Sequence, residues 1–124
     1  MDSTTKILIG VALAGIFAKL LLGGKADKGA DIPGLIKKGA LLIDTRTPGE
    51  FSRGHIEGAI NIPYDAIAEK IGQHTPDKSK PIIVYCRSGA RSSMAKQTLI
   101  RAGHTQVVNG GSLHRMRKLT NPIE

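Results

Sequence analysis

The stretch Ile82-Ile83-Val84-Tyr85-Cys86-Arg87-Ser88-Gly89-Ala90-Arg91-Ser92 contains the only cysteine of the chain and decides how the chain around it folds. Its first four residues form a continuous apolar run, which is typical of a strand buried on both faces of a parallel sheet. A short turn with Gly89 follows Cys86, and the residues after the turn favour a helix. The pattern therefore places Cys86 between the end of a buried strand and the N-terminus of a helix.

This position favours a reactive thiol. Backbone N–H groups of the turn, at the positive end of the helix dipole, stabilise a thiolate. Arg87 and Arg91 add positive charge, so we expect the pKa of the Cys86 thiol to lie below the roughly 8.5 of a free cysteine. The same N–H groups would hold an anion beside the sulfur, such as a sulfonate-like sulfur donor or a phosphoryl group. The alternative is an inert cysteine buried at a strand end, against which the following glycine and arginines argue.

Composition limits the other function classes. A chain of 124 residues with 40% hydrophobic residues predicts one small domain with a single core. One cysteine excludes an intramolecular disulfide, and no Cys and His spacing typical of a metal site is present. The net charge of +8 is spread along the chain and aromatic residues make up 3%, which disfavours nucleic-acid binding. A basic surface that attracts small anions fits the charge better.

The N-terminus differs from the remainder of the chain. Residues 7–22 are almost all apolar and are interrupted only by Lys19, so we divide the chain into an anchor or signal segment with its linker at 1–31 and a domain at 32–124. We expect an uncleaved membrane anchor; a cleaved secretory signal and a soluble helix are the alternatives. Lysines are more numerous on the C-terminal side of the run, which favours a cytoplasmic domain, whereas a cleaved signal would export it to a compartment such as the periplasm.

Strands and helices are predicted to alternate along the rest of the chain. The expected strands are residues 41–43, 59–63, 82–85 and 107–108, and the expected helical segments are 48–54, 64–71, 92–102 and 110–119. In this prediction Gly72 ends the second helical segment, and Gly110-Gly111 opens the last. Such alternation predicts an α/β fold, with a central, mostly parallel sheet and helices on both faces. Ligands bind beyond the carboxyl ends of the strands in such sheets, where Cys86 is predicted to lie.

Three patches carry a resemblance to a known family: Asp44-Thr45-Arg46 with Glu50-Phe51, then Gly54-His55-Ile56 with 58–63, and the 85–92 loop followed by Gly110-Gly111. With these patches in this order, the chain from about Leu35 to Glu124 resembles a single-domain rhodanese, a sulfurtransferase. The resemblance implies a rhodanese-like fold. It also implies that Cys86 takes a sulfane sulfur from a donor such as thiosulfate, carries it as a persulfide, and passes it to cyanide or a thiol.

The chemistry of that reaction assigns roles to the loop. A thiolate attacks the outer sulfur of thiosulfate, sulfite leaves, and backbone amides stabilise the persulfide and the departing charge. The predicted substrate-binding loop consists of Arg87, Ser88, Gly89, Ala90, Arg91 and Ser92, whose two arginines orient the anionic donor. We expect Asp44 and Arg46 to support the neighbouring loops through hydrogen bonds. The reaction requires no metal and no organic cofactor.

Two alternatives to this enzyme remain. Six residues span Cys86 to Arg91, which resembles the sulfurtransferases, whereas the related cysteine phosphatases have one residue more; phosphatase activity is therefore the weaker hypothesis. A non-catalytic rhodanese-like binding or regulatory module is the other alternative, and the intact Cys86 argues against it. The sequence indicates no particular protein partner.

The remaining polar residues are interpreted as structural or exposed. His55 is expected to form a structural hydrogen bond. We expect three other histidines to lie on the surface: His74, His104 and His114. Arg115 stands where many relatives carry tryptophan, and with Arg117 and Lys118 it is expected to give the last helix a basic outer face.

Overall fold

The computed structural model describes residues 25–121. The predicted anchor, residues 7–22, lies outside them. Within the described part of the chain, no helix has both the length and the apolar character that crossing a bilayer requires.

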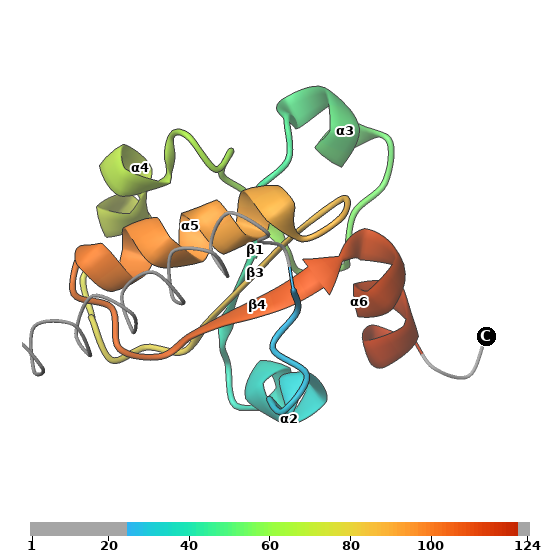
Figure 1. The fold of residues 1–124 in the computed structure, drawn as a ribbon, viewed down its shortest axis with the longest axis horizontal. Helices are drawn as coiled ribbons and strands as arrows, with labels where there is room; N and C mark the ends of the chain where they lie inside the picture. Colours follow the sequence, from blue (N-terminus) through green and yellow to red (C-terminus); the bar gives the residue numbers. More distant parts are fainter. Residues whose placement is uncertain (1–24, 122–124) are drawn as a thin grey trace, which may run out of the picture.

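A parallel sheet of four strands forms the centre of the domain (Figure 1). The strands are β1 (Leu41–Asp44), β2 (Ile60–Asn61), β3 (Ile82–Cys86) and β4 (Val107–Ser112), in the order β2-β1-β3-β4. β3 lies between β1 and β4, and all five of its residues are buried. The continuous apolar run that predicted a strand covered on both faces is thereby explained.

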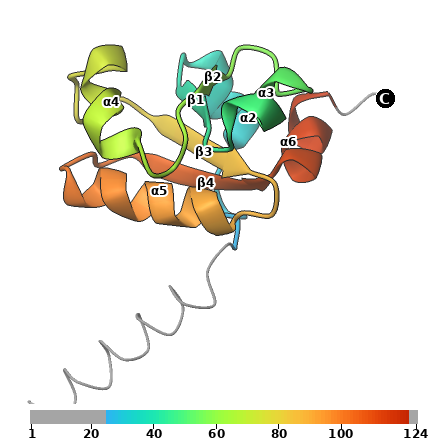
Figure 2. The ribbon, with the colours of Figure 1, turned by 90° about the horizontal axis from the view of Figure 1, so that it is seen from above.

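Helices cover both faces of the sheet (Figure 2). α4 (Ile67–His74) and α5 (Ala90–Arg101) lie on one face, α2 (Ile32–Lys37) and α6 (Leu113–Thr120) on the other, and the short α3 (Pro48–Ser52) follows β1. Two apolar cores result, because alternate residues of β3 point to opposite faces. Ile82 and Val84 pack with α4 and α5, whereas Ile83 and Tyr85 pack with α2 and α6. The predicted α/β class and the two-sided arrangement are confirmed.

Two helices differ from the prediction. α2 was not predicted, although its signals are present: Asp31 caps its N-terminus by accepting a hydrogen bond from Gly34 N at 3.1 Å, and Pro33 lies in its first turn. α4 continues through Gly72 to His74, so the prediction that Gly72 ends the helix was wrong. Gly72 is exposed, and a glycine inside a helix weakens it without ending it.

The glycine pair near the C-terminus also differs from the prediction, because it belongs to β4 and not to the last helix. Val84 pairs with Asn109 and Tyr85 with Gly111, which leaves Gly110 as an extra residue in a β-bulge. A Cβ on Gly110 would lie 2.5 Å from the Sδ atom of the buried Met116, so the glycine leaves room for this side chain of α6 against the strand. α6 begins after this bulge, at Leu113, and is capped by Ser112.

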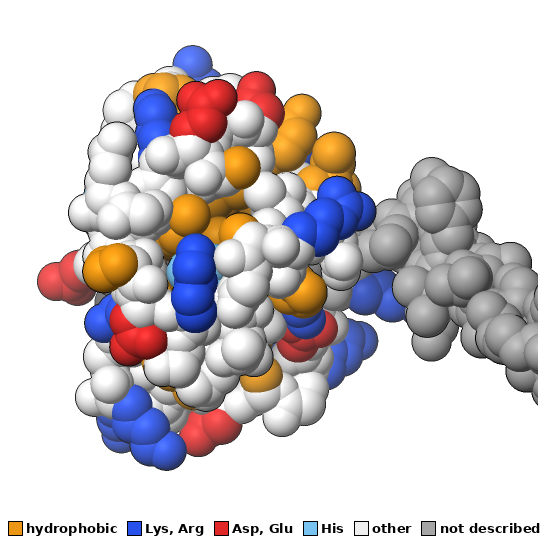
Figure 3. All heavy atoms as spheres, turned by 90° about the vertical axis from the view of Figure 1, so that its left-hand side faces the viewer, with side chains coloured by type: hydrophobic (Ala, Val, Ile, Leu, Met, Phe, Trp, Pro, Cys, Tyr) orange, Lys and Arg blue, Asp and Glu red, His pale blue; other side chains and the backbone are white. Residues whose placement is uncertain are grey.

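The side chains of α6 bear out only part of the expected basic face. Arg115, expected on the outside of the helix, is half-buried, and its Nη1 donates to Gly110 O at 2.8 Å. Arg117 and Lys118 are exposed as expected. On another face of the molecule, formed by the left-hand side of Figure 1, basic and acidic side chains are interspersed around apolar atoms (Figure 3). The positive net charge is therefore not gathered on that face.

Part of the segment assigned to the linker contacts the domain. Asp27 N donates to Asn109 O on β4 at 2.8 Å, and the Asp27 carboxylate accepts from Asn109 N at 2.8 Å and from Lys96 Nζ on α5 at 2.6 Å. The chain from Lys25 then runs beside β4 into α2 (Figure 1). Residues 25–31 are thus tied to the sheet and to one helix.

His104 is buried, so the prediction that it lies on the surface was wrong. The residue is 2% exposed, and within residues 25–121 neither ring nitrogen has a hydrogen-bond partner. Burial lowers the pKa of His104 below its ordinary value, with a smaller effect from the nearby Lys78. His74 and His114 are exposed, as expected.

Candidate functional site

Cys86 is the last residue of β3 and lies at the floor of the loop that leads into α5. Its sulfur accepts hydrogen bonds from Gly89 N at 3.0 Å and from Ser92 N at 3.4 Å, and Ser92 Oγ lies 3.5 Å away. The residue is fully buried. The buried sulfur is therefore surrounded by hydrogen-bond donors of the loop.

The sequence produces this loop through a single glycine. Gly89 has φ +96°, in the left-handed region that other residues adopt only with strain, and it is the N-cap of α5. This conformation turns the Gly89 N–H toward the Cys86 sulfur while the chain enters the helix. The Ser92 N–H, free in the first turn of α5, completes the arrangement.

Opposing influences set the pKa of the Cys86 thiol. Burial raises it, but hydrogen bonds from the Ser92 hydroxyl and from the N–H groups of Ser92, Ser88 and Gly89 together lower it below its ordinary value. The direction is the one expected from the sequence. The main lowering contributions come from hydrogen-bond donors of the loop, whereas the charges of Arg87 and Arg91 were also expected to lower the pKa.

The two loop arginines have different surroundings. Arg91 forms a two-pronged ion pair with Glu50 of α3, with Nη1–Oε1 at 2.6 Å and Nη2–Oε2 at 3.0 Å. Hydrogen bonds from Arg91, and to a smaller extent those from Thr47 in the capping box of α3, together lower the pKa of Glu50 to about 2. Arg87 is exposed. Glu50 was not predicted as a partner of the loop, since the two residues are far apart in sequence.

Asp44 and Arg46 form a buried pair at the end of β1. Arg46 Nη2 lies 2.7 Å from Asp44 Oδ2, and the same nitrogen donates to Gly54 O at 2.7 Å. Asn61 of β2 donates through Nδ2 to Asp44 O at 3.1 Å and to Arg46 O at 2.9 Å. The pair thus links β1 to the loop after α3 and to β2.

The structure divides the predicted loop into two groups. Gly89 and Ser92 are buried and contact the sulfur of Cys86. The other members are exposed or only half-buried: Arg87, Ser88, Ala90 and Arg91. Asn109, which was not predicted as a site residue, contacts both buried members of the loop. Within residues 25–121, no group of three or more His, Cys, Asp and Glu side chains could hold a metal ion.

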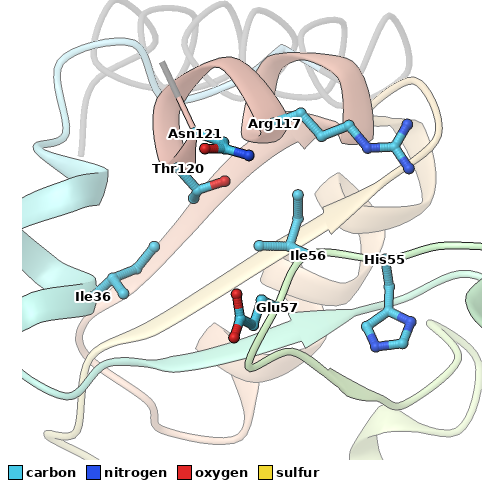
Figure 4. Close-up of a pocket in the computed structure, with 7 residues that line it drawn as sticks. All are labelled: Ile36, His55, Ile56, Glu57, Arg117, Thr120 and Asn121. Carbon is cyan, nitrogen blue, oxygen red and sulfur yellow. The ribbon is translucent and has the colours of Figure 1, made fainter. Parts of the chain in front are cut away.

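A separate pocket of about 530 Å³ lies between α2, α6 and the loop after α3 (Figure 4); it is lined by Ile36, His55, Ile56, Glu57, Arg117, Thr120 and Asn121. His55 stacks on Phe51 with ring centroids 3.6 Å apart, and its Nδ1 lies 2.8 Å from Phe51 O. Ile56 N donates to the Tyr85 hydroxyl at 3.0 Å, which connects the pocket wall to β3. None of the predicted site residues lines this pocket.

Fold and site together define a class: a small α/β domain that holds one cysteine in an amide-lined loop at the carboxyl end of its central parallel strand. The chain belongs to the rhodanese-like domain family, whose sequence profile matches residues 30–112. The family resemblance and the rhodanese-like fold expected from the sequence are confirmed.

Relatives of known name support the assignment. Thiosulfate sulfurtransferase PspE of Escherichia coli (strain K12) is 42% identical over 71 residues, covering 57% of this chain and 68% of that protein. Thiosulfate sulfurtransferase 16, chloroplastic, of Arabidopsis thaliana is 40% identical over 84 residues, covering 59% of this chain and 69% of that protein. The solved structure of a rhodanese with anions from E. coli superposes with a TM-score of 0.60 at 39% identity, covering 62% of this chain and 91% of that one. The match to another relative, from Bacillus subtilis, covers 54% of the length of that protein.

Proposed function

We propose that this protein is a thiosulfate sulfurtransferase, which moves a sulfane sulfur from an anionic donor such as thiosulfate to cyanide or a thiol acceptor through a persulfide on Cys86. The observation that carries the proposal is the sulfur of Cys86 accepting hydrogen bonds from two backbone N–H groups, at 3.0 and 3.4 Å. Named sulfurtransferases among the relatives support it.

The first step forms the persulfide. The Cys86 thiolate attacks the outer sulfur of thiosulfate, a new S–S bond forms, and the S–S bond of the donor breaks with its electron pair leaving on sulfite. The N–H groups of Gly89 and Ser92 already face this sulfur and stabilise the negative charge on it.

The second step returns the free thiolate. The acceptor, cyanide or a thiolate, attacks the outer sulfur of the persulfide, and the bonding electron pair returns to Cys86. Because Cys86 is fully buried, donor and acceptor reach it past the exposed residues of the loop. Arg87 and Ser88 are exposed at this entrance. In this proposal Arg87 makes the first contact with the anionic donor, while Arg91, held by Glu50, keeps the loop in place.

Intact mass spectrometry tests the proposal. The full-length protein is incubated with thiosulfate, and a gain of about 32 Da, one sulfur atom, is expected; cyanide should remove it, and Cys86→Ser should never acquire it. No mass gain with thiosulfate or with a polysulfide donor would contradict the proposal. Hydrolysis of an aryl phosphate by the wild type and not by Cys86→Ser would instead favour the phosphatase alternative.

We further propose that residues 7–22 attach the protein to a membrane with the domain on the cytoplasmic side. The proposal rests on the apolar run and on the lysines that follow it. Fractionation of cells and protease treatment of vesicles of known sidedness would test it. Protein in the soluble fraction, or a domain protected on the opposite side, would contradict it, and a mature N-terminus beyond residue 22 would indicate a cleaved signal.

A further inference from the structure

Asn109 on β4 lies behind the cysteine loop and contacts it with its side chain. The residue is 2% exposed. Its Oδ1 accepts hydrogen bonds from Ser92 Oγ at 2.7 Å and from Gly111 N at 2.9 Å, and its Nδ2 donates to Gly89 O at 3.3 Å. Asn109 therefore touches the two residues whose N–H groups face the sulfur of Cys86.

The Ser92 hydroxyl has one proton and more than one acceptor. Asn109 Oδ1 lies 2.7 Å from Ser92 Oγ, Gly89 O lies 3.1 Å away and Cys86 Sγ lies 3.5 Å away. Gly89 O also accepts from Ser93 N at 3.0 Å. Because the contact to Asn109 Oδ1 is the shortest of the three, Asn109 is the favoured acceptor of the Ser92 O–H hydrogen bond while Cys86 is a thiol.

The balance between the acceptors changes when the thiol loses its proton. A thiolate accepts hydrogen bonds far more strongly than a thiol, whereas the amide oxygen of Asn109 is unchanged. If the Ser92 hydroxyl turns toward the sulfur, Asn109 Oδ1 retains the hydrogen bond from Gly111 N, so the turn leaves no buried acceptor without a donor.

We propose that Asn109 is a positioning residue: it accepts the hydrogen bond of the Ser92 hydroxyl while Cys86 is a thiol, and the hydroxyl turns this hydrogen bond to the sulfur of the thiolate or the persulfide anion. The inference rests on the proposed function, since it assigns a second residue to the same site. The proton stays on Ser92 throughout, and only the direction of its hydrogen bond changes.

Asp27 fixes the position of Asn109 from outside the sheet. Its N–H and its carboxylate pair with the O and N atoms of Asn109, each at 2.8 Å, and the carboxylate also binds Lys96 Nζ at 2.6 Å. Lys96 lies one helical turn after Ser92 on α5. Asp27 therefore ties together the two elements that carry the hydroxyl and its acceptor.

The charged groups on β1, on α3 and in the loop around Cys86 are separate from this arrangement. They lie on β1, on α3 and in the loop: Asp44, Arg46, Glu50, Arg87 and Arg91. Within residues 25–121 no hydrogen bond joins any of them to Asn109, whose partners are Ser92, Gly89, Gly111, Lys25 and Asp27. A substitution at Asn109 therefore leaves these charges in place.

The test measures the pKa of the Cys86 thiol in the full-length protein with no sulfur donor present. The ultraviolet absorbance of the thiolate is followed against pH, and the spectrum of Cys86→Ser is subtracted. Asn109→Ala removes the competing acceptor, and we expect the thiol pKa to fall by about half a unit. Ser92→Ala removes the donor, and we expect the thiol pKa to rise by about one unit. In the double variant the effect of Asn109→Ala should vanish, because no hydroxyl remains.

Gln106→Ala is the matched control. It removes a side-chain hydrogen bond just before β4, from Gln106 Nε2 to Ser79 O at 2.7 Å, and should leave the thiol pKa unchanged. If Asn109→Ala raises the thiol pKa, or shifts it equally with and without Ser92, Asn109 is only a scaffold and the proposal is wrong.

A second measurement on the wild type keeps the proposal testable if Asn109→Ala does not fold. Gly111 N–H shares Asn109 Oδ1 with the hydroxyl, so its amide proton resonance should move with the titration of Cys86 and should stay still in Ser92→Ala. A Gly111 resonance that does not move, or that moves equally in Ser92→Ala, overturns the proposal. Neither measurement uses a sulfur donor, so failure of sulfur loading and failure of this inference are distinguishable.

Discussion

Glu50 on α3 holds Arg91 of the cysteine loop through two parallel contacts, 2.6 Å between Oε1 and Nη1 and 3.0 Å between Oε2 and Nη2. The same carboxylate caps α3, accepting from Thr47 N at 3.2 Å. One side chain therefore fixes both the helix that follows β1 and the loop that follows β3. The loop arginine that remains exposed is Arg87.

Glu50→Gln should make the stability of the folded protein less dependent on pH in the acid range. The pKa of Glu50 is lowered to about 2 in the folded protein, so its ion pair stabilises the fold fully above the ordinary carboxyl pKa and loses that effect as pH falls toward 2. We expect at most about 1 kcal/mol at neutral pH, since the pair is partly exposed and screened. Thermal unfolding at about pH 7 and about pH 3 measures this. Glu69→Gln, on α4, controls for the loss of one negative charge, and an equal acid sensitivity in Glu50→Gln and the wild type would contradict the prediction.

Arg87→Ala should weaken donor binding without unfolding the domain. Arg87 is exposed at the entrance to the cysteine loop, and one charge-assisted contact to an anion corresponds to about a tenfold rise in KM for thiosulfate. Steady-state kinetics with thiosulfate and cyanide measures it. Arg101→Ala, at the far end of α5, is the matched control for net charge. A similar KM in both variants would show that Arg87 does not orient the donor.

Gly89→Ala should weaken both the fold and the acidity of the thiol. At φ +96° a side chain introduces strain of about 1 kcal/mol or more, and relief of the strain moves the Gly89 N–H away from the sulfur. Unfolding free energy should fall and the pKa of the Cys86 thiol should rise. Gly72→Ala is the control, because its Cβ would meet open space on an exposed helix and should stabilise by roughly 0.5–1 kcal/mol. A Gly89→Ala protein with the wild-type thiol pKa would contradict the assigned geometry.

His104→Leu should stabilise the protein, and more so in mild acid. Burial lowers the pKa of His104 in the folded protein below its ordinary value of 6.5. As pH falls below 6.5, the unfolded chain takes up a proton that the folded protein excludes, so the folded protein loses stability as the pH is lowered. Leucine removes this loss and two buried nitrogens that have no partner in the described structure. Urea unfolding at about pH 7.5 and about pH 5 should show a growing difference from the wild type. For His74→Gln, at an exposed position, the difference in stability from the wild type should not increase between the two pH values. If the difference for His104→Leu is the same at both pH values, the prediction is wrong.

The local patterns that predicted the fold were those with a single physical interpretation. The apolar run of β3 can be buried only between two layers, and the turn at Gly89 explains why the thiol faces backbone N–H groups. α2 was missed although Asp31 and Pro33 signal its start, because its six residues are too few for a clear apolar period.

Partners far apart in sequence could not be predicted from local patterns. Arg91 meets Glu50 across 41 positions, and Asn109 meets Asp27 across 82. His104 reads as a loop residue, and only the packing of neighbouring segments buries it. None of these contacts corresponds to a repeating pattern of residues in the sequence.

The sequence by itself determined the α/β class, the family and the position of Cys86 in an N–H-lined turn, because strand burial, glycine conformation and helix starts are set by neighbouring residues. Only the tertiary structure decided that Arg91 is paired while Arg87 is exposed, and that the Ser92 hydroxyl donates to Asn109 Oδ1 behind the sulfur. The physical reason is that hydrogen bonds and ion pairs form between whichever groups the packed layers bring within about 3 Å, and that distance depends on the whole fold.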